Sequence, residues 1–435
     1  MKNPMRLALA LGGACFVSVL LTPACVVVTR GGPDFVYSST DWPEKVERTE
    51  TRALAVAAGQ TLRAETPYGS IRVRASADGS ASMHAVVRAA GRTQADAQAL
   101  LDRAQVVVEE TDRGVSLRLE VARDASDSDR RPQPAVDFEI ELPADVALEL
   151  VSRSGPVQAE GGPFGPARLE SSYGSVQVEN VRGDVSATSK SGRVDVAHVS
   201  QGSVTASSGY GAVSVVDVDA GAVSAKSSSG HVQLARVKAR RVTAESGYGA
   251  VGVREAQVEH EIEARSKSGS VTAESVKAAR VQLGSGYGPI RVSKVEGDLS
   301  LETSSGSISV VDVRGALAAK TGYGSIDVDG VLSVLALESK SGSVKAHARA
   351  ESSVDSEWTL TSSYGRVELR APKDLAFDLS ARTGYGQIEV GYALQVAPGA
   401  LGKNGREIQG SINGGGKTVR LKSASGNVVV TPTDS

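Results

Sequence analysis

Tyrosines that directly precede a glycine are the residues of this chain whose type and spacing best suit binding chemistry. From residue 173 onwards this happens at seven places: Tyr173, Tyr210, Tyr248, Tyr287, Tyr323, Tyr364 and Tyr385. A phenol ring combines a large apolar face with a polar tip, so an exposed ring can stack on a sugar or anchor a protein partner. If exposed, these residues would form a contact surface for a glycan or an envelope protein.

The residues before each tyrosine favour a structural role for the ring instead. In VTASSGYG, the residues Val204, Ala206, Ser208 and Tyr210 fall on the same side of an extended strand. Val204 and Ala206 are typical core residues, so this parity directs Tyr210 inward. Turns without tyrosine carry a serine at the same place: Ser191, Ser229, Ser268, Ser305 and Ser341. Because large and small residues that alternate can share a confined corner, we expect buried tyrosines and keep the exposed surface as the alternative.

Other residue types form no catalytic or metal-binding pattern. The five histidines have no metal-ligand spacing: His84, His198, His231, His260 and His347. The segment GSINGGGK (410–417) lacks the spacing of a phosphate-binding loop. Serines before glycine lack the helix that follows a nucleophile elbow. We therefore expect a non-enzymatic protein with no catalytic residue, metal or cofactor.

Acidic residues recur on several of the expected strands, but the overall charge is balanced. Five of them hold similar strand positions: Asp195, Asp217, Asp312, Asp327 and Glu389. They would form either an acidic strip for cations or a basic partner, or an ordinary solvated face, which we favour. With 48 Lys and Arg against 50 Asp and Glu, the chain lacks the basic footprint of a nucleic-acid-binding protein.

The N-terminal residues have the layout of a secretory signal. A short basic stretch, MKNPMR, precedes the apolar run LALALGGACFVSVLL and then Cys25. The residues before Cys25 resemble a lipobox, although Leu21 is one place too far upstream and Pro23 intervenes. We expect a signal peptide over 1–24, a lipid anchor on Cys25 and a tether over 25–44. Cleavage near Ala24 without lipidation, or an uncleaved anchor, are the alternatives.

A lipid on Cys25 would hold the protein to a membrane of the cell envelope, outside the cytoplasm. Val26 stands where lipoproteins kept at the inner membrane often carry an aspartate, which favours an outer-membrane lipoprotein. Both cysteines, Cys15 and Cys25, lie in this leader, so we expect no disulfide in the mature chain.

A repeat of about 19 residues organises most of the chain. Eleven glycines from Gly155 to Gly342 divide 187 residues into ten nearly equal steps. In GSVQVENVRGDVSATSKS (174–191), two alternating apolar runs flank a turn at Gly183, so each unit reads as strand, turn, strand, turn. Including the tyrosines, the full period is two units.

Stacked repeats explain this pattern better than a β-sandwich does, because a sandwich needs no constant spacing. We expect an all-β parallel β-solenoid, wound right-handed by analogy with parallel crossovers. Aromatic residues make up only 4% of the chain, which fits a thin core of small residues. Tyrosines in alternate coils would lie about 9–10 Å apart.

The two ends depart from the repeat and are expected to be caps that protect open strand edges. Residues 45–150 are predicted to form a mixed β cap with one short helix, Gln94–Ala104, and 151–390 the solenoid. Residues 391–435 are predicted to form a C-terminal β cap, closed by the strands of 417–430.

Two segments and the repeat unit itself resemble a known family. They are PAVDFEIELPADVALELVSRSGPVQAE (134–160), INGGGKTVRLKSASGNVVV (412–430) and the repeated Ser/Thr-x-x-Gly-x-Val/Ile-x-Val unit. Over 45–435 the sequence is similar to a bacterial β-strand-repeat family of unknown function whose members are often labelled as candidate adhesins. The resemblance implies a solenoid at the cell envelope and brings no catalytic residues.

We therefore expect a non-enzymatic lipoprotein whose solenoid acts as a scaffold or adhesin. The alternatives are a carbohydrate-binding or polysaccharide-active β-helix protein, which needs clustered carboxylates when it cleaves glycans, and an envelope regulatory protein acting through a partner.

Overall fold

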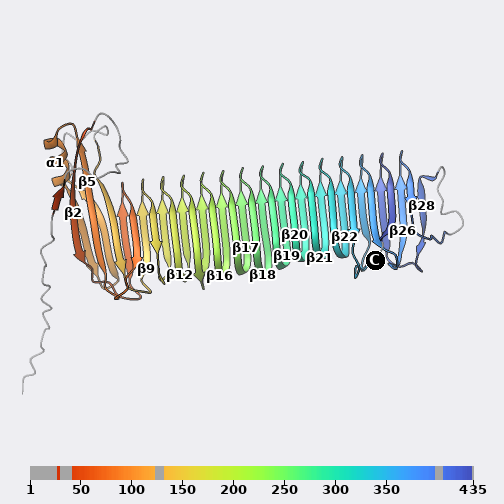
Figure 1. Ribbon diagram of the computed structural model, residues 1–435, viewed down its shortest axis with the longest axis horizontal. Helices are drawn as coiled ribbons and strands as arrows, with labels where there is room; N and C mark the ends of the chain where they lie inside the picture. Colours follow the sequence, from red (N-terminus) through yellow and green to blue (C-terminus); the bar gives the residue numbers. More distant parts are fainter. Residues whose placement is uncertain (1–26, 30–41, 123–131, 397–404, 434–435) are drawn as a thin grey trace, which may run out of the picture.

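The chain forms one long stack of β-coils with a small cap at its N-terminal end (Figure 1). The computed structural model describes residues 27–29, 42–122, 132–396 and 405–433. Within these residues there is one helix, α1 (Gln94–Arg103), and every strand belongs to a single hydrogen-bonded sheet system. The predicted all-β solenoid with coils of about 19 residues is confirmed; its right-handed winding stays a prediction.

The central coils pair in parallel and in register with the coil before and the coil after. Val213 lies opposite Val232, and Val232 lies opposite Val251, each one coil along. The strands are β9 (Ala147–Ser152), β10 (Val157–Glu160), β11 (Ala167–Ser171), β12 (Val176–Arg182), β13 (Val185–Ser189), β14 (Val194–Ser200), β15 (Ser203–Ser208), β16 (Val213–Ser227), β17 (Val232–Ser246), β18 (Val251–Ser266), β19 (Val271–Ser285), β20 (Ile290–Thr303), β21 (Ile308–Thr321), β22 (Ile326–Ser339) and β23 (Val344–Ala348).

Small apolar residues fill the narrow interior of each coil. In the coil of β17, Val232, Leu234, Val237, Val242 and Ala244 are each no more than 1% exposed. A fully buried valine or leucine contributes about 1.5–3 kcal/mol relative to an exposed one. Each coil can bury such residues only against its neighbours, so the core is a continuous file along the stack, and few aromatic side chains fit into it.

A column of left-handed residues bends each coil. The φ angle lies between 51° and 62° at Asn180, His198, Asp217, Arg236, Glu255, Ser275, Lys294 and Asp312. Each of these residues bulges out of the pairing, and the residue after it is buried, as Val218 is after Asp217. The bulge shifts the period-2 alternation by one residue. After the bend, the apolar side chains of the strand therefore still point into the core.

The N-terminal cap is built from antiparallel strands and α1. It contains β2 (Glu44–Ala53), β5 (Ser82–Gly91), β6 (Ala104–Thr111), β7 (Gly114–Val121) and β8 (Ala135–Leu142). Thr93 caps α1, and Arg48 of β2 donates to the carbonyl of Ala104 at its end. Within the expected tether, residues 27–29 form a strand, β1 (Val27–Thr29), which pairs antiparallel with β2, and Glu44 already belongs to β2.

The coil formed by β3 (Thr61–Thr66) and β4 (Ile71–Ala75) lies second in the stack although it comes first in the chain. β3 pairs in parallel with both β7 and β9, and β4 pairs with both β8 and β10. After β4 the chain therefore leaves the solenoid and forms the cap. It then returns as β7 and β8 on one side of the coil of β3 and β4, and as β9 and β10 on the other side. The stack thus reaches beyond the predicted solenoid limits of 151–390.

The last segment of the chain is inserted in the same way at the other end. β29 (Thr418–Ser423) pairs in parallel with β24 (Trp358–Ser362) and β26 (Phe377–Thr383). β30 (Val428–Thr433) lies between β25 (Val367–Pro372) and β27 (Ile388–Val390). The expectation that 417–430 closes the stack is therefore wrong. The end is covered by β28 (Glu407–Ile412), which lies antiparallel on β26 and occupies its open edge.

Candidate binding edge

A buried hydroxyl holds each coil to the next at the turn that contains the repeated glycine. The Ser246 hydroxyl donates to the carbonyl of Gly230 in the neighbouring coil at 2.9 Å and accepts the amide of Gly249 at 2.9 Å. The same arrangement recurs for Ser152, Ser171, Ser189, Ser208, Ser227, Ser266, Ser285, Thr303, Thr321, Ser339, Ser362, Ser423 and Thr383. A continuous ladder of hydroxyls therefore seals this corner of the core.

The glycine of each turn is required by close approach. A Cβ at Gly249 would lie 2.2 Å from the carbonyl oxygen of Gly230, and the equivalent clash is 1.9–2.3 Å along the whole column. In stacking order the column is Gly69, Gly155, Gly174, Gly192, Gly211, Gly230, Gly249, Gly269, Gly288, Gly306, Gly324, Gly342, Gly365, Gly426 and Gly386. Except for Gly69, whose φ is +114°, the column glycines do not have a positive φ, so glycine is required here because the backbones lie close together.

The seven tyrosines are exposed, so the expectation of buried corner residues is wrong. Their exposed fractions lie between 69% and 81% for Tyr173, Tyr210, Tyr248, Tyr287, Tyr323, Tyr364 and Tyr385. The parity argument fails because β15 ends at Ser208, so the alternation stops before Gly209 and Tyr210. The corner that we assigned to the ring is filled by the Ser208 hydroxyl, and the ring projects from the turn.

Tyrosine and serine alternate without a break along the physical stack. In stacking order the residue before the column glycine is Tyr68, Ser154, Tyr173, Ser191, Tyr210, Ser229, Tyr248, Ser268, Tyr287, Ser305, Tyr323, Ser341, Tyr364, Ser425 and Tyr385. The out-of-order coils keep the alternation, because Ser154 follows Tyr68 and Ser425 falls between Tyr364 and Tyr385. We call these turns, from two residues before each column glycine to one residue after it, the tyrosine edge. In Figure 1 they form the row of hooks beyond the arrowheads.

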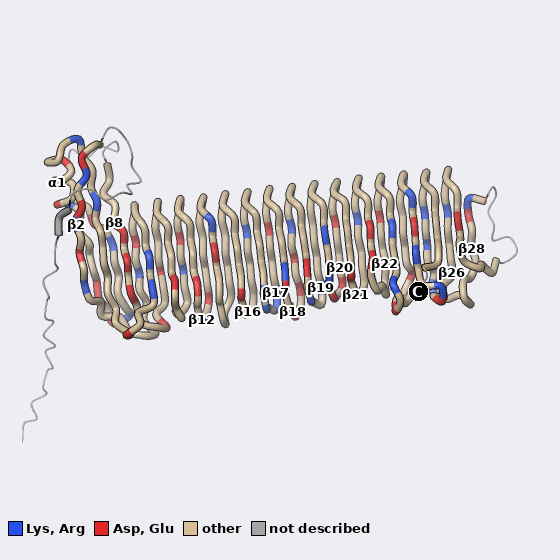
Figure 2. The backbone as a smooth tube through the Cα atoms, in the orientation of Figure 1, with Lys and Arg blue, Asp and Glu red and all other residues tan. Residues whose placement is uncertain are grey.

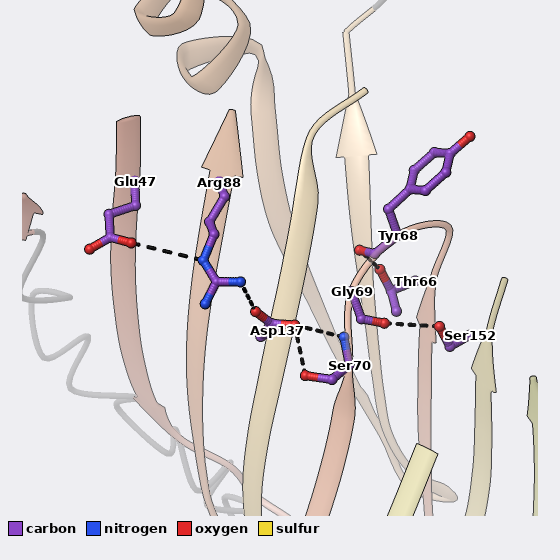
Figure 3. A network of polar contacts seen from close by, with 8 residues as sticks. All are labelled: Glu47, Thr66, Tyr68, Gly69, Ser70, Arg88, Asp137 and Ser152. Atoms are coloured by element: carbon purple, nitrogen blue, oxygen red, sulfur yellow. Dashed lines mark hydrogen bonds and ion pairs between the residues drawn. The ribbon is translucent and has the colours of Figure 1, made fainter. Parts of the chain in front are cut away.

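The ladder begins at the turn of β3 and β4 (Figure 3). Ser152 donates to the carbonyl of Gly69 at 2.9 Å, as in later coils. The Thr66 hydroxyl differs from the later ones, because it donates to the carbonyl of Tyr68 in its own turn at 2.7 Å. The first tyrosine turn is thus closed on itself, and Tyr68 is partly buried.

A carboxylate of the cap fixes this first turn in place. Asp137 on β8 accepts both the amide and the hydroxyl of Ser70 at 2.7 Å. Arg88 on β5 pairs with Asp137, and Glu47 on β2 lies 3.9 Å from Arg88 (Figure 3). These contacts therefore connect the first turn of the tyrosine edge to three strands of the cap, β8, β5 and β2.

The five acidic residues singled out in the sequence do not form one strip. Asp195, Asp327 and Glu389 follow the tyrosine edge, each three residues after its column glycine, whereas Asp217 and Asp312 belong to the left-handed column at the bend. Arg236, one coil along, donates two hydrogen bonds to Asp217 at 2.6 and 2.8 Å. Those hydrogen bonds hold the pKa of Asp217 below its ordinary value. Paired charges of this kind are typical of a solvated face.

The remaining sequence candidates do not come together. Within the described ranges, no three His, Cys, Asp or Glu side chains lie close enough to hold a metal ion. His231 accepts the amide of Ala250 at 2.9 Å, and His347 contacts Asp329 at 2.9 Å, in separate coils. Cys25 lies outside the described residues. No helix in the described part of the chain is both long and apolar enough to span a membrane.

The geometry defines a β-solenoid repeat protein with an aromatic edge, and comparison of the sequence places it in a family. The chain matches the family described as Toastrack DUF4097 over residues 144–230, 212–328 and 260–431. These overlapping matches span more than half of the chain, so the protein belongs to the Toastrack DUF4097 family. The family resemblance seen in the sequence is confirmed.

Three solved structures also match the chain. A candidate cell adhesion protein from Clostridium sporogenes ATCC 15579 is 8% identical, covering 89% of this chain and 100% of that one, with a TM-score of 0.16. Candidate adhesins from Bacteroides fragilis NCTC 9343 and Parabacteroides distasonis ATCC 8503 are each 11% identical, covering 88% of this chain and 97% of theirs, with TM-scores of 0.22. At these TM-scores the likeness supports no statement about function. No curated protein matches the chain.

Proposed function

We propose that this protein is a non-enzymatic, lipid-anchored envelope protein that uses the tyrosine edge of a rigid solenoid for adhesive contacts. The observation that carries the proposal is the exposure of seven tyrosines at 69–81% in every second coil. Large aromatic side chains are costly to leave in water, and soluble proteins rarely expose a continuous series of them without a binding role. A straight row of this kind fits an extended polymer.

The composition of the edge favours binding over cleavage. Glycan-cleaving enzymes place a pair of carboxylates beside the scissile bond. The turns of the tyrosine edge, all within the described residues, contain no Asp or Glu. A substrate lying on the tyrosines would therefore meet no acid-base pair there.

The proposed anchor is a lipid on Cys25, following a signal peptide over 1–24. Val27, two residues after Cys25, begins β1, and β1 pairs with β2 of the N-terminal cap. A lipid so close to the cap would hold that end of the solenoid at the membrane, and the stack would extend away from it. Replacing Cys25 with alanine should abolish lipid labelling and release the protein from the membrane fraction.

The adhesive role is tested by changing tyrosine turns into serine turns. The triple variant Tyr210→Ser, Tyr248→Ser, Tyr287→Ser gives three turns the residue that neighbouring coils already carry, so folding should be unchanged. We expect cells that display the full chain to lose most of their attachment to surfaces coated with envelope polymers or glycans. Equal attachment by the variant, at equal surface amount and thermal stability, would exclude the tyrosine edge as the adhesive surface.

A further inference from the structure

The charges of the tyrosine edge suggest which kind of polymer it binds. Its fifteen turns contain six cations and no Asp or Glu: Arg153, Lys190, Arg193, Lys267, Lys340 and Arg366. The whole chain has a formal net charge of −2, so the positive edge differs from a chain whose charge is nearly balanced. In Figure 2 the tips of the hooks are mostly tan, whereas both red and blue bands mark the strands below.

Four of the six cations are unpaired, which distinguishes them from the other two. Arg193 and Arg366 each pair with a carboxylate two residues along the chain, Asp195 and Glu368. In contrast, no ion pair within the described chain involves Arg153, Lys190, Lys267 or Lys340, all of which are exposed. These four keep their full charge available to a ligand.

The unpaired cations lie only in serine turns, but they do not occupy every serine turn. Each one lies in a serine turn, between two tyrosine turns, as Lys267 does between Tyr248 and Tyr287. Lys190, Lys267 and Lys340 recur every fourth coil, at intervals of about 19 Å, and tyrosines recur every second coil, at about 9.6 Å. The latter distance is close to the length of a disaccharide unit in an extended glycan.

The column of residues just before the ladder hydroxyls carries no comparable excess. The residues immediately before the ladder hydroxyls are outward-facing and include five acids and five bases, namely Glu65, Glu170, Glu245, Glu302 and Glu338 with Lys226, Arg265, Lys320, Arg382 and Lys422. Several pair along the stack, such as Lys226 with Glu245 at 3.1 Å and Lys320 with Glu338 at 3.2 Å. This neighbouring column therefore does not share the excess of positive charge on the tyrosine edge.

We propose that the tyrosine edge binds an acidic polysaccharide, laid along the stack with one disaccharide per two coils. Sugar rings stack on the tyrosines, and carboxylates of the polymer meet the unpaired cations between them. The serine hydroxyls of the alternate turns supply hydrogen-bonding groups for sugar hydroxyls. A periodic polymer explains why the same small pattern recurs along the whole edge, which a folded protein partner would not require. This inference rests on the proposed adhesive function.

Two cellulose derivatives test the charge requirement on a common backbone. Carboxymethyl cellulose carries carboxylates, and hydroxyethyl cellulose is neutral. We expect the full chain to bind the first at least tenfold more tightly, with binding weakened at about 0.5 M salt because screening shortens the range of exposed charges. Equal affinity for both would overturn the acidic part of the proposal while leaving the adhesive role intact. Binding of poly-glutamate as tight as that of carboxymethyl cellulose would overturn the glycan part.

Charge variants locate the site. Lys190→Ser, Lys267→Ser and Lys340→Ser together introduce the residue found at Ser228 and Ser304 in equivalent turns, and should weaken binding of carboxymethyl cellulose about tenfold. The control variant Lys226→Ser, Lys320→Ser, Lys422→Ser removes the same charge from the adjacent column and should bind normally. Equal losses in both variants would mean that net charge, and not the tyrosine edge, drives binding.

A position swap tests the two-coil register. Ser229→Tyr with Tyr248→Ser keeps the composition and moves one ring by a single coil. We expect its affinity to fall as far as that of Tyr248→Ser alone. Recovery of wild-type affinity would contradict the disaccharide register. Failure of every variant and of the wild type to bind any polymer would instead contradict the proposed function itself.

Discussion

At the scale of single residues, the buried hydroxyl before each turn contributes more to the stability of the stack than the tyrosine of the conspicuous Tyr-Gly pair. Ser246 is 5% exposed and satisfies two backbone groups that belong to different coils. A hydrogen bond of this kind contributes about 1 kcal/mol, and an unsatisfied buried group costs about 1–3 kcal/mol. The ladder therefore stabilises the interface between coils as well as the turn itself.

Substitution at Ser246 tests this role. Ser246→Ala should lower the free energy of unfolding by about 1–3 kcal/mol, because the carbonyl of Gly230 and the amide of Gly249 lose their partner. Ser246→Thr should have little effect, since Thr303, Thr321 and Thr383 make the same bonds elsewhere. Denaturant unfolding measures both. Similar losses for alanine and threonine would show that volume, and not the hydroxyl, is required.

The sequence contained the signal for this ladder, in the serine or threonine that precedes each column glycine by three residues. Period-2 alternation correctly placed Val204, Ala206 and Ser208 inside. It could not show where the strand ends, and one residue past that end the alternation no longer applies. The position of Tyr210 therefore depended on a backbone turn that residue types alone do not fix.

At the scale of secondary-structure elements, the two ends of the stack are built by inserting a strand pair out of sequence order. The sequence predicted a mixed β cap with one short helix over Gln94–Ala104, and the structure has α1 over Gln94–Arg103. The insertion of β3 and β4, and of β29 and β30, was not predicted, because the order of parallel strands depends on contacts between segments far apart in the chain. The unbroken alternation of Tyr and Ser is recovered only in this physical order.

The C-terminal end should respond to alkaline pH through Tyr392. Its hydroxyl donates to the carbonyl of Ala371 at 2.6 Å, and its ring packs on Phe377 at 5.9 Å. Burial, with a smaller contribution from the charge of Asp374, raises the pKa of Tyr392 from 10.0 to about 12. Because the folded state favours the neutral phenol, this contribution to stability is complete below pH 10.0 and is lost between pH 10.0 and about 12.

Comparison with Tyr392→Phe isolates this effect. At pH 8 the variant should be less stable by about 1 kcal/mol, because it lacks the hydroxyl. As the pH rises through the window in which tyrosine ionises, the difference in melting temperature between the two proteins should narrow. If both proteins lost the same stability over this pH range, ionisation of Tyr392 would not be linked to unfolding.

At the scale of the whole molecule, the solenoid turns a short motif into a long linear surface. Each tyrosine turn offers one ring, and several serine turns offer a cation, but a single ring or cation alone would bind weakly. Repetition on a rigid stack makes successive contacts intramolecular, so overall affinity rises with polymer length. The proposed anchor at Cys25 and the cap at the same end would leave the whole edge accessible from the side. Three features agree with this arrangement: the strands form one continuous sheet system, the overall charge is nearly balanced, and the tyrosine edge contains no Asp or Glu.

The most direct measurement is the reactivity of the tyrosines themselves. Nitration of the full chain, read by mass spectrometry, should modify the seven exposed tyrosines readily, and bound carboxymethyl cellulose should protect them along the stack. Tyr392, whose hydroxyl is bonded to Ala371, serves as the control and should react slowly with or without the polymer. Joint protection of the seven would support the tyrosine edge as the binding surface. Seven tyrosines that react equally in the free and the polymer-bound protein would contradict it.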